Sequence, residues 1–285
     1  MRITCARSQH ELCVDYFKNN FCNSLRKEAA VQFIDDAEFQ IAIDLDQGAR
    51  IASLKWREME FSVGFRGEVP TWGWYAMAPW AGRIRNGIVK NPAGKEFQLP
   101  TNFDPPHAMH GFGYTSSWRE IGPGRSLLEL PEPYGGATVE QTIEVLDDAI
   151  RWSLEYEPGN CDLPAWIGFH PWFPRDLGRG DSAEVEFKAH VMLERASDGL
   201  PTGKRIEPCK EPWDDIFTEV RGTPAVVWDG AARIDIECDT PWWVVYTEDS
   251  EGVCIEPQTA PPEAANLGIT GEHYMEALFV FSQDI

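Results

Sequence analysis

Short runs that alternate apolar and polar side chains follow one another along most of this chain. Apolar residues occupy every second position in 39–45, and similar runs recur at 139–145, 150–156 and 185–193. A period of two residues is typical of strands that bury one face. Further strands are expected at 233–238, 242–247, 253–255 and 277–281. Since no amphipathic helices separate these runs, the sequence predicts an all-β fold, a large antiparallel β-sandwich, and disfavours a parallel α/β fold.

Turn residues divide the predicted strands. The pair Asp147-Asp148 separates two alternating runs and predicts a hairpin, and 24 glycines and 21 prolines interrupt the chain at turn spacing. A hydrophobic fraction of 43% is enough for a large core, and sandwiches of this length can form one domain. We expect a single β-sandwich domain over residues 37–285.

The N-terminal segment has a different pattern. Leu12, Tyr16, Phe21 and Leu25 recur at close to four-residue spacing between charged residues. That spacing predicts a short amphipathic helix. We expect residues 1–36 to form an extension that packs on the outside of the sandwich.

Charge and cysteine content limit the partners. The net charge of −21 disfavours binding to nucleic acid or to an anionic membrane. Seven cysteines without a CxxC pair argue against a disulfide framework or a cysteine-built zinc site. No apolar run reaches the roughly 18 residues of a membrane span, and the first residues lack a secretory signal pattern. We therefore expect a cytoplasmic protein, monomeric or homodimeric.

Four segments combine polar residues with aromatics and turn formers, namely 78–87, 105–111, 168–173 and 254–258. Taken singly, each has an ordinary structural explanation. His170 could be a hydrogen-bonded core residue, and Glu256 could lie at an exposed strand end. His107 and His110 could be turn residues, and as a metal-binding pair they are a weak signal.

Taken together and in order, the four segments resemble those of the galactose mutarotase (aldose 1-epimerase) family. The matching elements are Arg83-Ile84-Arg85-Asn86-Gly87, His110-Gly111, His170-Pro171-Trp172-Phe173 and Glu256-Pro257-Gln258. The resemblance runs from about residue 37 to the C-terminus. One departure is Phe112, which stands where many members have a second glycine after the histidine.

The resemblance implies the mutarotase-like supersandwich and an enzyme that interconverts the α and β anomers of a hexose or related aldose. It places His170 as the general acid and Glu256 as the general base. It places His110 near the ring oxygen, and Arg83 and Asp214 on other sugar oxygens. His107 matches the first histidine of a family pattern without a clear role.

Ring opening and closure need one proton donor and one acceptor, and no metal, nucleotide or redox cofactor is expected. Flat aromatic rings suit the apolar faces of pyranoses. Trp80 and Trp172 lie beside the polar segments, so we expect both of them in the cleft.

Four alternatives stay open at this point. The substrate could be a hexose phosphate, with Arg85, Lys90 or Lys95 binding the phosphate. The protein could bind sugar without catalysis. It could be a glycoside hydrolase that uses Glu256 and Asp214 as its two carboxylates. It could also be a metal enzyme built on His107 and His110.

Overall fold

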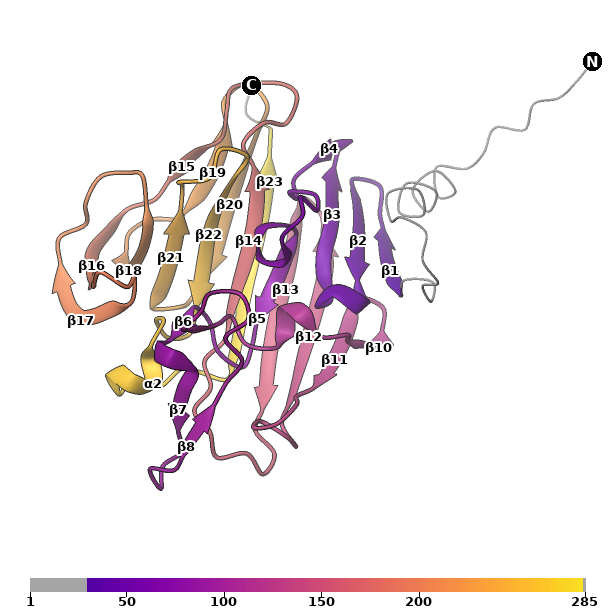
Figure 1. Ribbon diagram of the computed structural model, residues 1–285. Coiled ribbons are helices and arrows are strands. Elements are labelled where there is room, and N and C mark those ends of the chain that lie inside the picture. The colour runs from indigo at the N-terminus through magenta and orange to yellow at the C-terminus, as the bar shows by residue number, and fades with distance from the viewer. Residues whose placement is uncertain (1–29, 284–285) are drawn as a thin grey trace, which may run out of the picture.

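The computed structural model describes residues 30–283, and its regular structure is mostly antiparallel β-sheet (Figure 1). The larger sheet has the strand order β1-β2-β3-β5-β14-β22-β21-β18-β16-β17, with β4 beside β3. Its strands are β1 (Val31–Asp35), β2 (Phe39–Asp44), β3 (Arg50–Trp56), β4 (Met59–Glu60), β5 (Trp74–Met77), β14 (Gly168–Pro174), β16 (Ala189–Arg195), β17 (Pro201–Ile206), β18 (Asp214–Val220), β21 (Trp242–Tyr246) and β22 (Gly252–Gln258).

The second sheet has the order β10-β11-β12-β13-β23-β20-β19-β15. Its strands are β10 (Arg119–Gly122), β11 (Arg125–Glu129), β12 (Thr138–Leu146), β13 (Ala149–Glu157), β15 (Glu184–Glu186), β19 (Ala225–Trp228), β20 (Ala232–Cys238) and β23 (Tyr274–Ser282). Two small ribbons pair β6 (Arg83–Ile84) with β9 (Ala108–Met109) and β7 (Ile88–Lys90) with β8 (Glu96–Gln98). The helical elements are short: η1 (Leu45–Gln47), η2 (Val69–Thr71), η3 (Arg85–Gly87), η4 (Gly113–Thr115) and α2 (Ala264–Leu267).

Large aromatic side chains join the two sheets. Trp74 of β5 contacts Phe279 of β23, with ring centroids 4.8 Å apart. Trp152 of β13 stacks on Phe169 of β14 at 4.2 Å. Rings of this size bury much apolar area and tie facing sheets together. The core of the sandwich therefore lies between the two sheets. The opposite face of the larger sheet does not contact the second sheet.

The predicted hairpin is confirmed. Strands β12 and β13 pair along their whole length around Asp147-Asp148. The single run expected over 185–193 is wrong in one respect, because the structure divides it between two sheets. Strand β15 pairs with β19 in the second sheet, and β16 pairs with β17 and β18 in the larger one. The chain crosses between the sheets near Phe187, which packs against Phe217.

At the N-terminal end, the expected amphipathic helix falls on residues that the structure does not describe. Strand β1 lies within the expected extension 1–36, and it pairs in full with β2 as an edge strand of the larger sheet. The sheet thus begins before residue 37. In the described part of the chain, none of the helices has the length and apolar character that a membrane crossing requires.

Candidate active site

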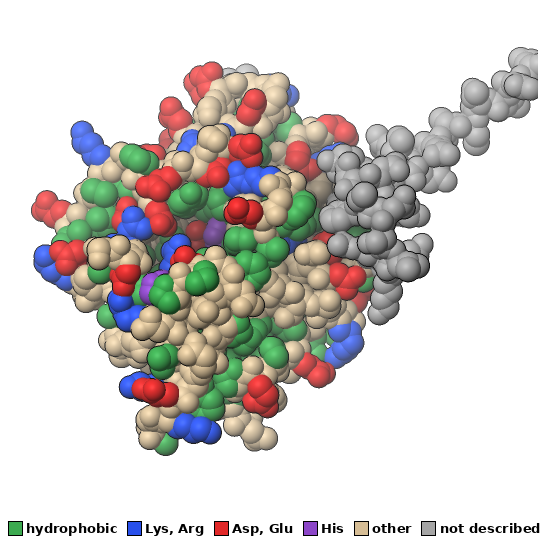
Figure 2. All heavy atoms as spheres, viewed as in Figure 1, with side chains coloured by type: hydrophobic (Ala, Val, Ile, Leu, Met, Phe, Trp, Pro, Cys, Tyr) green, Lys and Arg blue, Asp and Glu red, His purple; other side chains and the backbone are tan. Residues whose placement is uncertain are grey.

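A cavity of about 340 Å³ lies on the face of the larger sheet that points away from the sandwich core. Its lining includes His170 and Trp172 of β14, Glu256 and Gln258 of β22, Asp214 and Ile216 of β18, and Val244 and Tyr246 of β21. It also includes Pro70 and Thr71 of η2, Arg83 of β6, Met109 of β9, and the loop residues Asp104, His110, Leu200, Glu248 and Asp249. Figure 2 shows acidic and basic side chains together around a hollow in which a histidine is visible. Strands of the larger sheet therefore supply the floor of the cavity, and loops with the short elements β6, β9 and η2 supply its walls.

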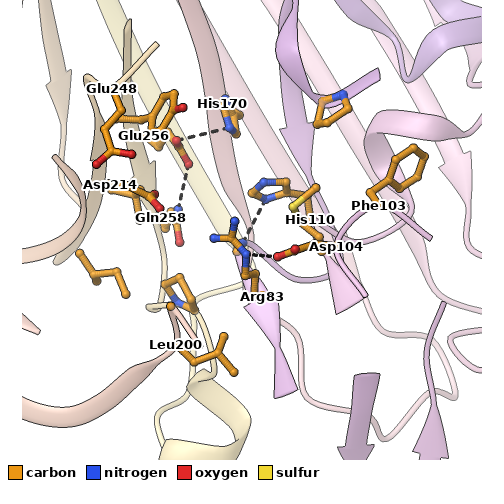
Figure 3. A pocket seen from close by; sticks show the side chains of 18 of the residues that line it. Arg83, Phe103, Asp104, His110, His170, Leu200, Asp214, Glu248, Glu256 and Gln258 are labelled. Carbon is orange, nitrogen blue, oxygen red and sulfur yellow. Dashed lines mark hydrogen bonds and ion pairs between the residues drawn. The ribbon is translucent and has the colours of Figure 1, made fainter. Parts of the chain in front are cut away.

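His170 and Glu256 are cross-strand neighbours on this floor. Strands β14 and β22 pair with Gly168 opposite Gln258 and Trp172 opposite Cys254, and the same register places His170 opposite Glu256. The distance from His170 Nε2 to Glu256 Oε1 is 3.3 Å (Figure 3). Both side chains are largely buried, with exposures of 8% and 4%. The sheet register therefore brings a histidine and a carboxyl group into direct contact.

The strand period explains why these side chains reach the cavity. Along β22, Val253 and Ile255 belong to the core, whereas Glu256 and Gln258 line the cavity. Successive side chains of a strand point to opposite faces, so a polar residue can alternate with core residues at no cost to packing. The Gln258 amide Nε2 donates to Glu256 Oε2 at 3.3 Å, which leaves Oε1 facing His170.

Aromatic rings hold His170 in place. Its imidazole stacks on Tyr75 of β5, with centroids 4.6 Å apart and planes 26° apart. Trp172 stacks at 5.5 Å, and His110 meets the ring edge-on at 5.1 Å. Nδ1 of His170 is buried and has no hydrogen-bond partner among the described residues. Ring contacts therefore fix this imidazole, in place of the usual hydrogen bond to its second nitrogen.

Burial shifts both groups toward their uncharged forms. It lowers the pKa of His170 to about 3. Burial, together with the nearby Asp214 carboxylate, raises the pKa of Glu256 well above its ordinary value. Desolvation disfavours a charged imidazolium and a charged carboxylate alike. Of the two groups, Glu256 is therefore the more basic, so a single proton held by the pair lies on the carboxyl group rather than on the imidazole.

His110 reaches the cavity from a tight turn. It has φ 56°, and the following Gly111 has φ 74°. A Cβ at Gly111 would lie 2.0 Å from the carbonyl oxygen of Ala78, so only glycine fits there. The Gly82 N–H donates to His110 Nδ1 at 3.2 Å, which leaves the ring proton on Nε2. Burial, with His170 and Arg83 nearby, lowers the pKa of His110 well below its usual value, so the ring is a neutral donor.

Ion pairs position the charged groups of the walls. Arg83 donates through Nε to the Asp104 carboxylate. Arg195 Nη1 donates to Asp214 Oδ2 at 2.6 Å, and its Nε lies 3.2 Å from Asp215 Oδ1. In Figure 3, Asp214 lies on the opposite side of the cavity from Asp104. The site thus presents both donors and acceptors that already have fixed orientations.

Not all of the predicted site residues line this cavity. His170, Glu256, Arg83, His110, Asp214 and Trp172 do. Trp80 is only 1% exposed and packs against Phe112 and Tyr134, with centroids 5.3 Å and 6.0 Å away. His107 is 7% exposed and accepts a hydrogen bond from the Asn86 N–H through Nδ1. Neither Trp80 nor His107 is among the lining residues.

The sequence did not single out several residues that shape the site. Tyr75 lies in a region rich in tryptophan, so the sequence does not distinguish it from aromatic residues of the core. Asp104 and Arg195 act as ion-pair partners of Arg83 and Asp214, and such pairing depends on tertiary contacts. The position of Gln258 in the site could have been predicted, because it is two residues from Glu256 on an alternating strand and so shares its face.

One group of side chains in the described part of the chain combines possible metal ligands. The ligand atoms of His170, Cys254 and Glu256 lie within 4.8 Å of one another. His107 and His110 are not part of any such group among residues 30–283. Nothing in this geometry supports the metal site considered for those two histidines.

Comparisons with known proteins give a family match and several similar folds. The model of the family described as aldose 1-epimerase matches residues 30–274. Over 224 residues the chain is 25% identical to the uncharacterised protein YihR of Escherichia coli K12. The aligned region covers 68% of this chain and 71% of YihR. Its fold is similar to that of a GalM/aldose epimerase homologue from C. elegans, with a TM-score of 0.71 and 16% identity over 90% of this chain and 100% of the other. A galactose mutarotase-like protein from Clostridium acetobutylicum gives a TM-score of 0.69 at 15% identity, covering 90% and 98%. Because the family match spans most of its length, this chain belongs to the aldose 1-epimerase family.

Proposed function

We propose that this protein is a mutarotase that interconverts the α and β anomers of an uncharged aldose, with His170 and Glu256 as its catalytic residues. The observation that carries the proposal is the 3.3 Å contact between His170 Nε2 and Glu256 Oε1 on the floor of the cavity. Family membership agrees with an isomerase of this kind.

The chemistry needs two groups that lie close together. Opening a pyranose ring removes the proton from the hydroxyl on C1 and adds one to the ring oxygen. Both oxygens are bonded to C1, so a donor and an acceptor that are themselves neighbours can reach them at hydrogen-bond distance. His170 and Glu256 have this spacing, and one proton held by the pair could pass through either group.

One shared proton serves both directions of the reaction. The resemblance to the family assigns His170 as donor and Glu256 as acceptor during opening. In the empty site the pKa shifts place the proton on Glu256 instead. Ring closure reverses each transfer, so both placements occur within one turnover. Sugar binding would bring polar oxygens to the pair and make the charged placement accessible.

Three further residues would hold the sugar. Arg83 donates its Nε–H to Asp104, so its other guanidinium donors would be available to sugar hydroxyl oxygens. Asp214 accepts from Arg195 through Oδ2 and keeps Oδ1 for a sugar hydroxyl. His110, with its proton on Nε2, would donate to an oxygen near C1. Trp172 would add an aromatic surface to the cavity wall.

The charges of the cavity favour an uncharged substrate over a phosphorylated one. The lining carries the arginines Arg83 and Arg195 against a larger number of carboxyl groups, namely Asp104, Asp214, Glu248, Asp249 and Glu256. Both arginines are already paired with carboxylates. A phosphate here would meet a surplus of negative charge.

The basic residues considered for a phosphate lie outside this cavity. Arg85 and Lys90 line a separate pocket and pair with Asp198 and Glu96. Lys95 lies over the ring of Phe97. No contact in the described residues brings any of the three to His170 or Glu256.

The proposal is tested by following anomer exchange with one-dimensional NMR across a panel of free hexoses and their 6-phosphates. We expect acceleration above the spontaneous rate for at least one free hexose, and weaker acceleration for its 6-phosphate. Preference for the phosphate would contradict the assignment of an uncharged substrate. No acceleration of any aldose by folded protein would contradict the mutarotase function itself.

A further inference from the structure

A buried thiol lies beside the proposed catalytic pair. Cys254 is two residues before Glu256 on β22, so both side chains leave the same face of the strand. Cys254 is opposite Trp172 on β14, one step along the face from His170. Its exposed fraction is 0%, and it is not among the residues that line the cavity. The thiol therefore lies on the cavity side of the strand, next to the pair, but neighbouring side chains cover it and keep it out of reach of a sugar.

The ligand atoms of these three residues form a compact triangle. The Cys254 thiol, the His170 imidazole and the Glu256 carboxyl group have one ligand atom each within 4.8 Å of the others. A thiolate, an imidazole nitrogen and a carboxylate oxygen are the three donor types that Zn²⁺ binds in proteins. Three protein ligands with one open position are typical of accessible zinc sites.

We propose that His170, Cys254 and Glu256 form a binding site for a thiophilic divalent cation such as Zn²⁺, and that its occupancy blocks sugar turnover. The cation would be an inhibitor, because it takes the nitrogen and the oxygen that the sugar needs.

The geometry requires only small movements. Bonds of about 2.3 Å to sulfur and about 2.0 Å to nitrogen or oxygen place tetrahedral ligand atoms about 3.3–3.5 Å apart. The His170–Glu256 contact, at 3.3 Å, already meets that spacing. The Cys254 sulfur lies at most 4.8 Å from the other two ligand atoms and must approach them to about 3.5 Å. The open fourth position would face the cavity, where His170 and Glu256 are reached (Figure 3).

The charges also balance. Binding expels the thiol proton and the carboxyl proton to solvent, and the resulting thiolate and carboxylate together neutralise a dication. Ring contacts with Tyr75 and Trp172 already fix the imidazole, so less ordering of His170 is needed on binding. Gln258 holds the other carboxylate oxygen of Glu256 through Nε2. Such outer contacts orient the ligands of a metal site.

Cobalt absorption tests the site without reference to catalysis. Co²⁺ added to the metal-free full-length protein should give a thiolate-to-cobalt absorption band that added Zn²⁺ abolishes. The band should be lost in Cys254→Ala and kept in Cys209→Ala, which removes an exposed thiol as a matched control. The difference between these variants excludes signals from other cysteines. His170→Asn removes a second ligand and should also abolish the band, which covers the case in which Cys254→Ala fails to fold.

The second experiment, inhibition of anomer exchange by Zn²⁺, rests on the proposed function. Zn²⁺ should inhibit anomer exchange by the native protein competitively with sugar, and a chelator should restore the rate. Relative to its own metal-free rate, Cys254→Ala should need at least about tenfold more Zn²⁺ for the same inhibition, whereas Cys209→Ala should match the native protein.

The cobalt absorption and the Zn²⁺ inhibition experiments distinguish a failure of the metal site from a failure of the proposed function. Equal cobalt bands in native protein, Cys254→Ala and His170→Asn would overturn the metal site. Equal Zn²⁺ sensitivity of native protein and Cys254→Ala would overturn the blocking role. A Cys254-dependent cobalt band in protein that never accelerates anomer exchange would support the metal site and contradict only the proposed function.

Discussion

The imidazole of His170 lies against the ring of Tyr75, with centroids 4.6 Å apart and planes 26° apart. The two residues are directly opposite each other on β14 and β5, and Glu256 faces His170 from the other neighbouring strand. Three adjacent strands therefore align a ring, an imidazole and a carboxyl group in one row. Because His170 Nδ1 has no hydrogen-bond partner among the described residues, the stack with Tyr75 is one of the few contacts that restrain the imidazole, together with Trp172, His110 and Glu256.

Removing that stack should lower turnover. Tyr75→Leu should reduce kcat about 2- to 10-fold, because an aromatic pair contributes about 0.5–1.5 kcal/mol beyond its buried area. Tyr75→Phe keeps the ring and loses only the hydroxyl, which donates to the Pro70 carbonyl at 3.0 Å on the cavity rim. We expect Tyr75→Phe to change KM more than kcat. Steady-state anomer exchange with both variants checks this, and equal kcat values for Leu and Phe would show that stacking does not position His170.

The activity should persist on the acid side of neutrality. Burial lowers the pKa of His170 to about 3, so the imidazole does not gain a proton between about pH 7 and pH 5. We expect kcat/KM, corrected for the spontaneous reaction, to stay level over that interval. The first decline should come as the pH rises and Glu256 loses its proton. An inflection near pH 6.5 with lower activity on the acid side would indicate an exposed, ordinary histidine.

The buried carboxyl group should reduce stability as the pH rises. Because burial raises the pKa of Glu256 in the folded protein, its contribution to stability is complete below the unfolded pKa of about 4.5 and is lost at higher pH. Glu256→Gln cannot ionise and can still accept from Gln258. We expect the variant to have a higher Tm than the native protein at pH 8, with the difference shrinking toward pH 4. A thermal-shift series that shows the reverse trend would contradict this assignment.

Asp214 and Asp215 offer a matched pair for testing sugar contact. Both pair with Arg195, but only Asp214 lines the cavity. Asp214→Asn should raise KM about tenfold or more, because the amide replaces a charged acceptor for a sugar hydroxyl, and such bonds contribute about 1.5–3 kcal/mol. Asp215→Asn should leave KM near the native value. If both variants raise KM equally, the effect passes through Arg195, and Asp214 does not contact the sugar.

Alternation along the chain was enough to predict most of the strands, and it failed where the chain changes sheets. The β12–β13 hairpin follows from local pattern and turn chemistry, which act between near neighbours. The run 185–193 looked continuous because period-2 alternation marks a buried face without saying which sheet that face belongs to. In the structure, β15 belongs to the second sheet and β16 to the larger sheet, and Phe187 lies between them in the sequence.

The candidate site was harder to predict than the strands. Glu256 could have been an exposed strand end, and its burial depends on β22 lying between β14 and β21. The contact with His170 depends on the register of two strands that are far apart in the sequence. Trp80 was expected in the cleft because it lies next to polar residues, but its ring packs among Phe112 and Tyr134. Proximity in sequence did not indicate the direction of the side chain.

The central claim is that His170 and Glu256 together move the protons of ring opening. Saturation-transfer NMR of the two anomeric protons measures exchange directly, with native protein, His170→Asn and Glu256→Gln compared on the preferred aldose. We predict that each variant stays folded and lowers kcat by about 10²–10⁴-fold, the contribution of a positioned acid or base. A rate within a few-fold of native in either folded variant would contradict the claim.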